Sequence, residues 1–183
     1  MISPWDTLSR KTLLDTPVFS IHKVRRISRE TETEGEFYTL HTRDWVNVVA
    51  VTPAEGLVLI RQYRHGTDRV TLEIPGGLVD EGEDPAEAAI RELREETGYT
   101  GAEPILIGTV TPNPAIQTNY CYTYLITDAR KTQPPEPEEY EEIAVEIRPI
   151  SEMPAMIRNG EITHALVVAA FYYFQLQTNF LQE

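Results

Sequence analysis

The sequence predicts an α+β protein in which a mixed β-sheet lies between helices, an α/β/α sandwich. Three observations support this fold class. β-Type segments crowd the first part of the chain, one amphipathic helix then interrupts them, and two helices follow the last strand. With 183 residues and 41% hydrophobic side chains, the chain can bury one sizeable core. We expect an N-terminal β region, 1–44, and a main domain, 45–183, to form a single structural unit.

The predicted strands are rich in β-branched and aromatic residues and are bounded by turn residues. In the first half they cover 18–28, 36–42, 46–52, 57–63 and 70–74. In the second half they cover 105–111, 120–127 and 143–147. The segment 133–142 is dominated by proline and glutamate, and we expect it to be a loop.

Helix signals flank 85–97, where Asp84 is a good N-cap, Pro85 suits the first helical position and Gly98 suits the stop. At 3.6 residues per turn its expected core stripe consists of Ala86, Ala89, Ile90, Leu93 and Thr97. Ser151 is expected to cap a short helix that stops at Gly160. Thr163 is expected to cap a longer one through Gln177. This last helix is apolar nearly all round, which predicts burial on more than one side.

The composition excludes some classes of partner. A net charge of −13 and an isoelectric point of about 4.7 leave no basic patch for nucleic acid. A phosphate-bearing substrate therefore requires a cation or local arginines. Cys121 is the one cysteine, so no internal disulfide forms, and no segment is long and apolar enough to predict a membrane span. We expect a cytoplasmic protein.

Acidic side chains cluster between Gly76 and Tyr99, where eight occur in 24 residues. Glu92, Glu95 and Glu96 share one side of the predicted helix, at spacings that bring like charges together. A solvated acidic face is the simplest interpretation. However, this stripe adjoins the apolar one, and Gly76 and Gly77 precede the helix. Carboxylate and carbonyl oxygens are the ligands that Mg²⁺ or Mn²⁺ prefers.

The same stretch resembles the Nudix box, G-x5-E-x7-R-E-U-x-E-E-x-G-U, in which U is a bulky apolar residue. The matching residues, in unbroken spacing, are Gly77, Glu83, Arg91, Glu92, Leu93, Glu95, Glu96, Gly98 and Tyr99. The resemblance implies the Nudix fold and a Mg²⁺-dependent hydrolase, with Mn²⁺ as an alternative. It implies that Glu92, Glu96 and the carbonyl of Gly76 bind metal, with Glu95 close by as a ligand or catalytic group. It assigns structural support to Gly77, Glu83 and Arg91.

Most of the chain is similar to the branch of ADP-ribose pyrophosphatases and nucleoside diphosphate sugar hydrolases. The similarity rests on Arg61-Gln62-Tyr63-Arg64, on Leu72-Glu73-Ile74-Pro75-Gly76-Gly77 and on Pro114, fifteen residues after Tyr99. It also rests on the acidic loop and Gly160-Glu161-Ile162-Thr163 further on. In this branch a glutamate of the late acidic loop often acts as general base. Glu139 fits this role best by spacing, and Glu141 is the alternative.

The resemblance also suggests residues that bind substrate. Arg61 or Arg64 would contact the diphosphate or terminal ribose, unless they form salt bridges to Glu73 or the acidic helix. Trp45 and Tyr38 would sandwich the base across subunits, or serve in core or dimer packing. The neutral Gln117 and Asn119 replace acidic residues of several ADP-ribose enzymes, which leaves GDP-mannose open as a substrate.

Together these features predict hydrolysis of the pyrophosphate bond of ADP-ribose or related nucleoside diphosphate sugars. The products would be a nucleoside monophosphate and a sugar phosphate. A triphosphate pyrophosphohydrolase and a non-catalytic ligand sensor are weaker alternatives, since the N-terminal β extension disfavours the first and the intact box the second. The long N-terminal β region and the apolar last helix suggest a homodimer.

Overall fold

The computed structural model describes residues 2–137 and 140–180. The chain divides into two compact units. The first, the N-terminal unit, comprises Met1–Asp44 and Thr111–Tyr120, and the second, the main unit, comprises Trp45–Val110 and Cys121–Glu183. Residues 111–120, which are distant in sequence from the first 44, belong to the N-terminal unit.

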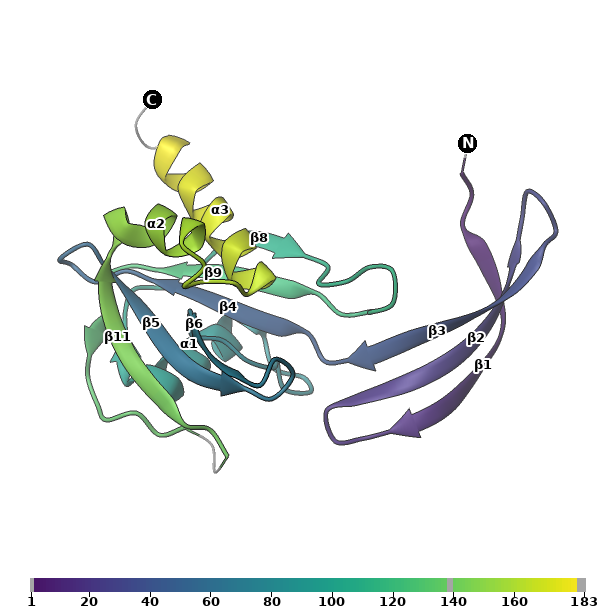
Figure 1. Ribbon diagram of the computed structural model, residues 1–183, viewed down its shortest axis with the longest axis horizontal. Coiled ribbons are helices and arrows are strands. Elements are labelled where there is room, and N and C mark those ends of the chain that lie inside the picture. Colours follow the sequence, from purple (N-terminus) through teal and green to yellow (C-terminus); the bar gives the residue numbers. More distant parts are fainter. Residues whose placement is uncertain (1, 138–139, 181–183) are drawn as a thin grey trace. The chain divides into compact units, whose positions relative to one another are not determined.

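The N-terminal unit is an antiparallel sheet in the order β1-β2-β3, formed by Trp5–Asp15, Phe19–Ser28 and Glu34–Thr42 (Figure 1). β1 was not predicted because nearly all of its side chains are exposed, so it lacks the alternation that a half-buried strand shows. The 111–120 loop is bonded to β3, since Leu40 N–H donates to the Ile116 carbonyl at 2.7 Å.

The main unit contains two three-stranded sheets and one two-stranded sheet. β4 (Trp45–Ala50) pairs in parallel with β9 (Cys121–Ile126), and β9 pairs antiparallel with β8 (Ile105–Val110). The second sheet has the order β11-β5-β6, formed by Ile143–Pro149, Gly56–Arg64 and Arg69–Glu73. The short strands β7 (Tyr99–Thr100) and β10 (Arg130–Lys131) pair with each other and were not predicted.

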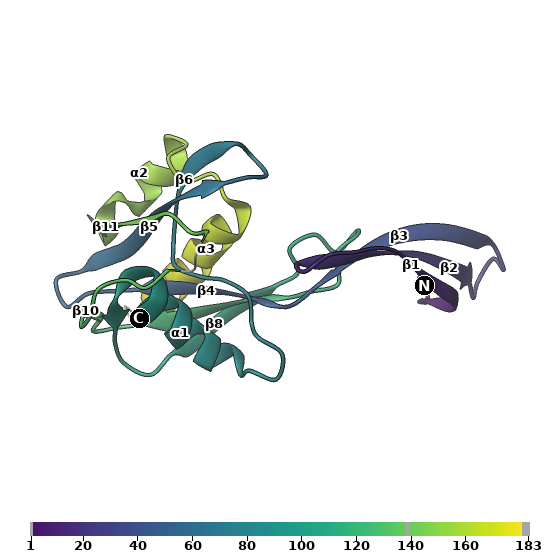
Figure 2. The same cartoon turned by 90° about the horizontal axis from the view of Figure 1, so that it is seen from below.

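Helices lie on both sides of these sheets (Figures 1 and 2). α1 (Pro85–Thr97) packs on a core that includes Val48, Val58 and Ile126. α2 (Met153–Arg158), which follows the 3₁₀ turn η1 (Ile150–Glu152), and α3 (Ala165–Phe180) cover the other core. The mixed sheets with helices on both sides confirm the predicted α+β sandwich.

Three helix details differ from the prediction. Glu152, not Ser151, occupies the cap of α2, because η1 occupies the preceding residues. α3 begins at Ala165, and the carbonyl of His164, the residue before it, accepts from Val168 N–H. The predicted cap, Thr163, lies one residue further from the helix. α3 is buried along one stripe only, formed by Val167, Ala170, Phe171 and Phe174, while Tyr172 is 61% exposed.

The described residues contain no helix that is both long enough and apolar enough to cross a membrane.

Candidate active site

The carboxylate-bearing helix α1 begins and ends where the sequence predicts. Asp84 caps it by accepting from Ala86 N–H at 2.8 Å, and Gly98 ends it in the left-handed conformation at φ 74°. Its buried face is rotated relative to the prediction. Ala88 and Glu96 are buried, whereas Ile90 is exposed. A glutamate therefore occupies the core-facing side of the helix.

Arg91 connects the helix to the loop before it. Its guanidinium forms a two-pronged pair with Glu83, at 2.8 and 3.0 Å, and donates to the Leu78 carbonyl at 2.9 Å. The same guanidinium donates to Glu92 at 2.8 Å and to Glu95 at 3.3 Å. The hydrogen bond with Glu83, followed by the charge of Glu92, raises the pKa of Arg91 and keeps it charged. Arg91 and Glu83 therefore link α1 to the loop that precedes it.

Glu92 and Glu96 are carboxylates withdrawn from water. Glu96 is 2% exposed and accepts from Gly76 N–H at 2.9 Å. Burial raises the pKa of Glu92 to about 7, although Arg91 opposes the shift. Burial, and then the charges of Glu92 and Glu141, raise the pKa of Glu96 well above its usual range. Both side chains therefore gain from a nearby cation.

The loop before the helix brings its backbone against these carboxylates. Val48 and Val46 of β4 donate to the carbonyls of Pro75 and Gly77 at 2.8 and 2.9 Å, which fixes the loop beside the sheet. A Cβ atom at Gly77 would overlap the Glu92 carboxylate, and one at Gly76 would overlap the Val46 carbonyl. Glycine is thus required at both positions for this close approach.

The acidic loop is hydrogen-bonded to the end of α1. Glu136 N–H donates to the Glu95 carbonyl at 2.7 Å, and Gln133 N–H donates to the Gly98 carbonyl at 3.2 Å. Further along, Glu141 accepts from Gln62 Nε2 of β5 at 3.3 Å. Its charge contributes to the raised pKa values of Glu92 and Glu96, so the three carboxylates form one electrostatic cluster. Glu139 lies outside the described residues.

The two predicted arginines lie on opposite faces of β5, as an odd spacing of three along a strand requires. Arg61 pairs with Glu146 at 2.8 Å, on the face that carries Leu57 and Leu59. Arg64 pairs with Glu73 through two hydrogen bonds of 3.0 and 2.8 Å. Against the effect of burial, the hydrogen bonds to Glu73 raise the pKa of Arg64, and the charges of Glu96 and Glu141 add to this rise. The salt bridge to Glu73 considered for these arginines is thus formed by Arg64 alone, whereas Arg61 pairs with Glu146, a partner that was not predicted.

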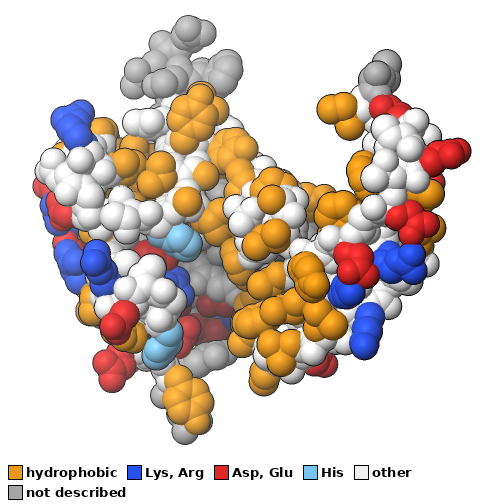
Figure 3. Space-filling model, turned by 45° about the vertical axis from the view of Figure 1, so that its right-hand side comes forward, with side chains coloured by type: hydrophobic (Ala, Val, Ile, Leu, Met, Phe, Trp, Pro, Cys, Tyr) orange, Lys and Arg blue, Asp and Glu red, His pale blue; other side chains and the backbone are white. Residues whose placement is uncertain are grey.

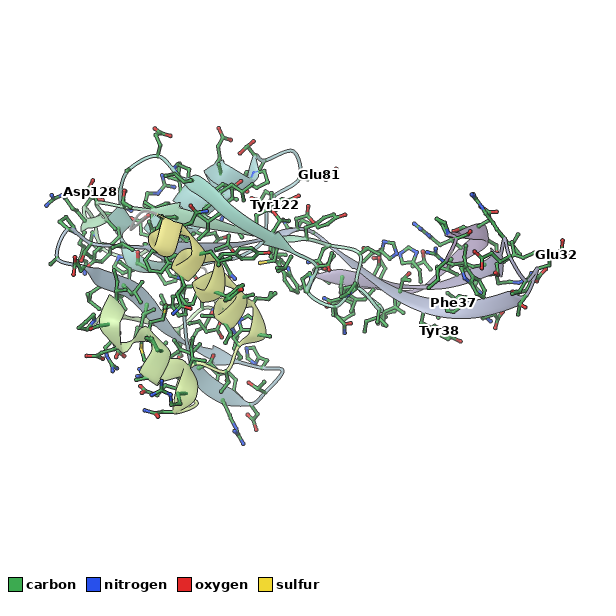
Figure 4. All side chains as sticks on the ribbon, turned by 90° about the horizontal axis from the view of Figure 1, so that it is seen from above. Glu32, Phe37, Tyr38, Glu81, Tyr122 and Asp128 are labelled. Atoms are coloured by element: carbon green, nitrogen blue, oxygen red, sulfur yellow. The ribbon has the colours of Figure 1, made fainter. Side chains whose placement is uncertain are left out.

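The other predicted substrate residues are placed as follows. Trp45 begins β4 and is half-buried, with bridge partners Cys121 and Leu78. Gln117 and Asn119 lie in the N-terminal unit, where Gln117 is bridged to Leu40. The Asn119 side chain is 2% exposed, and neither of its amide atoms has a hydrogen-bond partner among the described residues. Tyr38 projects from β3 and is 56% exposed (Figure 4).

The donor set around Glu92 and Glu96 fits a divalent cation in its chemistry. It offers buried carboxylates with raised pKa values beside a glycine loop, and these are hard oxygen donors. No three acidic, histidine or cysteine side chains of 2–137 and 140–180 already converge on one point. Glu92 is hydrogen-bonded to Arg91 instead, and Glu96 to the Gly76 N–H.

Two further residues belong to this site. Glu73 is 2% exposed and His164 contacts it, with Nδ1 at 2.9 Å from Oε2. The sequence predicted Glu73 only as a possible salt-bridge partner of the arginines. It gave no signal for His164, whose partner is distant in sequence.

Residues 41–171 match the NUDIX domain family. The chain belongs to the Nudix family. An ADP-ribose pyrophosphatase of Mycobacterium tuberculosis is 31% identical over 170 residues, which cover 90% of this chain and 80% of that protein. An ADP-ribose pyrophosphatase of Bacillus subtilis is 29% identical over 133 residues, 72% of each chain. The crystal structure of an ADP compounds hydrolase superposes with a TM-score of 0.87, covers 98% of this chain and 96% of its own, and is 22% identical.

These similarities confirm the predicted family, the Nudix fold and the ADP-ribose pyrophosphatase branch. The protein is a Nudix pyrophosphohydrolase. The acidic stretch in which like charges are crowded along the sequence is the Nudix box of this enzyme.

Proposed function

We propose that this Nudix enzyme hydrolyses the pyrophosphate bond of ADP-ribose or a related nucleoside diphosphate sugar. The products are a nucleoside monophosphate and a sugar phosphate. The observation that carries the proposal is the placement of the Glu92 and Glu96 carboxylates, both withdrawn from water, against the Gly76–Gly77 loop. The names of the M. tuberculosis and B. subtilis relatives support the substrate class.

Glu92 and Glu96, with the carbonyl of Gly76 and with Glu95 nearby, are the residues that would hold Mg²⁺ or Mn²⁺. A bound divalent cation supplies charge neutralisation and Lewis acidity at the phosphate oxygens. Arg91 and Glu83 keep the loop and helix in register, and Gly77 leaves room for the Glu92 carboxylate. Without such a cation, the acidic cluster would repel a diphosphate.

The other side chains bind substrate and move a proton. Arg64 contributes a positive charge that attracts the diphosphate, and its planar guanidinium suits two-pronged binding of phosphate oxygens. Glu141 accepts a proton from the attacking water, while Gln62 Nε2 holds its carboxylate. Glu139 is the second candidate for this base. Arg61 is engaged with Glu146 on the opposite face, so we assign it the weaker claim to substrate.

A panel of nucleotides tests this function. The purified protein is incubated with ADP-ribose, another ADP-sugar, GDP-mannose, UDP-glucose and ATP, each with Mg²⁺ or Mn²⁺, and the products are separated by chromatography. We expect nucleoside monophosphate to form fastest from the ADP-sugars. Preferential turnover of GDP-mannose would reassign the base specificity. Cleavage of ATP alone, or of no compound, would contradict the proposal.

We also propose that the enzyme is a homodimer assembled through its N-terminal unit. This sheet exposes apolar side chains (Figure 3), and the larger ones are Trp5, Leu8, Leu13, Leu14, Val18, Phe37 and Tyr38, each at least 36% exposed. Such a surface is typical of a subunit interface. Multi-angle light scattering at the concentration used for assays should give twice the chain mass of 20.8 kDa. A monomeric mass would refute the dimer.

A further inference from the structure

Glu73 is a buried carboxylate outside the Nudix box. Its side chain is 3% exposed, at the end of the edge strand β6. Four hydrogen bonds surround it: two from Arg64, one from Thr71 Oγ1 at 2.6 Å and one from His164 Nδ1 at 2.9 Å. Burial alone would raise the pKa of Glu73, but the bonds from His164 and Arg64 outweigh it and lower the pKa. The hydrogen bonds from Arg64 and Thr71 and the contact with His164 therefore favour the ionised form of Glu73.

Stability does not account for this arrangement. Burying an ion pair gains little over a well-packed apolar pair, because both charges lose their hydration. The pair is also asymmetric, since the Arg64 side chain is 40% exposed while Glu73 is nearly enclosed. The two bonds to Glu73 use Nε and Nη2 of Arg64. Within the described residues Nη1 makes no hydrogen bond, so the guanidinium is held on one side and open on the other.

His164 lies at the start of α3, which is hydrogen-bonded and packed against the main core. Its carbonyl accepts from Val168 N–H in the first turn of α3, and the carbonyl of Leu166 accepts from Asn47 Nδ2 of β4 at 3.1 Å. The following turns of α3 are packed in the core through Val167 and Phe171. The ring thus links a fixed helix start to the end of β6, across 91 residues of sequence.

We propose that His164 is a positioning residue, which acts through Glu73 to hold the Arg64 guanidinium in place for the substrate diphosphate. The proposal rests on the proposed function, since it requires a diphosphate as the ligand of Arg64. His164 itself touches neither substrate nor metal. Its contribution is the contact with Oε2 of Glu73, which prevents this carboxylate from rotating away from the Arg64 guanidinium.

Three substitutions of His164 test the chain of contacts. His164→Asn keeps a donor close to the position of Nδ1, His164→Gln places its amide near Nε2 instead, and His164→Leu removes the donor at similar volume.

A hydrogen bond to a charged group of this kind corresponds to roughly a 10- to 100-fold effect. We expect kcat/KM on ADP-ribose to fall about 10-fold or more in His164→Leu and His164→Gln, mainly through KM. His164→Asn should stay within about 3-fold of wild type. His65→Leu, an exposed histidine on the β5–β6 turn, is the matched control and should change nothing.

A double substitution shows whether the effect passes through Arg64. If it does, Arg64→Ala/His164→Leu is no slower than Arg64→Ala alone. Multiplicative losses would overturn the proposal, as would wild-type kinetics in His164→Leu.

A readout without turnover separates this inference from the proposed function. In ¹H–¹⁵N spectra of arginine side chains, the Arg64 Nε–H should be protected from exchange in the wild type and in His164→Asn. It should be lost to fast exchange in His164→Leu and His164→Gln, even if the melting temperatures of all variants remain equal. An unchanged Arg64 signal in His164→Leu would overturn the positioning role. If the wild type hydrolyses no diphosphate, the proposed function fails, and with it the catalytic role of the His164–Glu73–Arg64 contacts. The spectra still report whether His164 orders the Arg64 side chain.

Discussion

The two units of the molecule are built in opposite ways. In the main unit β4 and β5 are almost wholly buried, and two apolar cores lie on either side of the sheets. In the N-terminal unit, Val24 is the one fully buried apolar side chain of the described residues. Its strands are joined by exposed ion pairs, such as Arg29–Asp6 and Arg25–Glu34. Exposed pairs of this kind contribute little.

This difference indicates which unit is stabilised by its own core. The main unit carries the whole Nudix box and can hold it rigidly, because α1 and the Pro75–Gly77 loop are bonded to buried strands. The N-terminal sheet has too little core to be stable on apolar burial alone. In the proposed homodimer a second copy of the chain covers it. Four measurements test this contrast between the two units.

The largest effect is expected in the main unit, at Glu96. Glu96→Gln keeps the shape but removes the charge from the buried carboxylate that Gly76 N–H contacts. We expect kcat to fall roughly 10²- to 10⁴-fold, because electrostatic stabilisation of a phosphoryl transition state is the main catalytic term. Circular dichroism should show an intact fold. Glu81→Gln, in the exposed loop before the helix (Figure 4), is the charge-matched control and should retain full activity.

Next in size is a stability contrast between the two units. Leu59→Ala leaves a cavity in the main core and should cost about 2–5 kcal/mol of unfolding free energy. Leu13→Ala, on the 48% exposed side chain of β1, should cost less than about 0.5 kcal/mol and instead weaken the dimer. Urea unfolding and light scattering measure the two effects. Equal losses of stability would show that the N-terminal sheet has a core of its own.

A smaller catalytic effect is expected at the acidic loop. Glu141→Gln should lower kcat about 10- to 100-fold, because the side chain held by Gln62 loses its ability to accept a proton. The neighbouring Glu142→Gln is exposed and serves as control. If both variants retain wild-type kcat while Glu139→Gln does not, the base is Glu139.

The smallest effect is a pH dependence of stability without divalent cations. The folded pKa of Glu92, about 7, lies above its unfolded value, so the folded chain holds a proton that the unfolded chain has released. Unfolding free energy should therefore fall as pH rises from about 4.5 to 7, by on the order of 1–3 kcal/mol. Adding Mg²⁺ at pH 7.5 should restore it. Glu92→Gln should flatten the slope, and a slope unchanged in that variant would assign it to another group.

The features predictable from sequence were those with local causes. Caps and spacing located α1, and alternation located the buried strands. β1 escaped because an exposed strand has no apolar face to reveal it. Ile90 was misplaced because rotating the helix buries Ala88 and Glu96 together, which a purely apolar stripe does not anticipate. The His164–Glu73–Arg64 chain joins three distant segments, so only the fold brings it into view.

The products formed from ADP-ribose test the proposed pyrophosphatase activity of the enzyme most directly. With Mg²⁺ present, the account predicts AMP and ribose 5-phosphate in equal amounts, and no reaction once EDTA removes the cation. Release of inorganic phosphate or pyrophosphate instead, or unchanged turnover in EDTA, would contradict it.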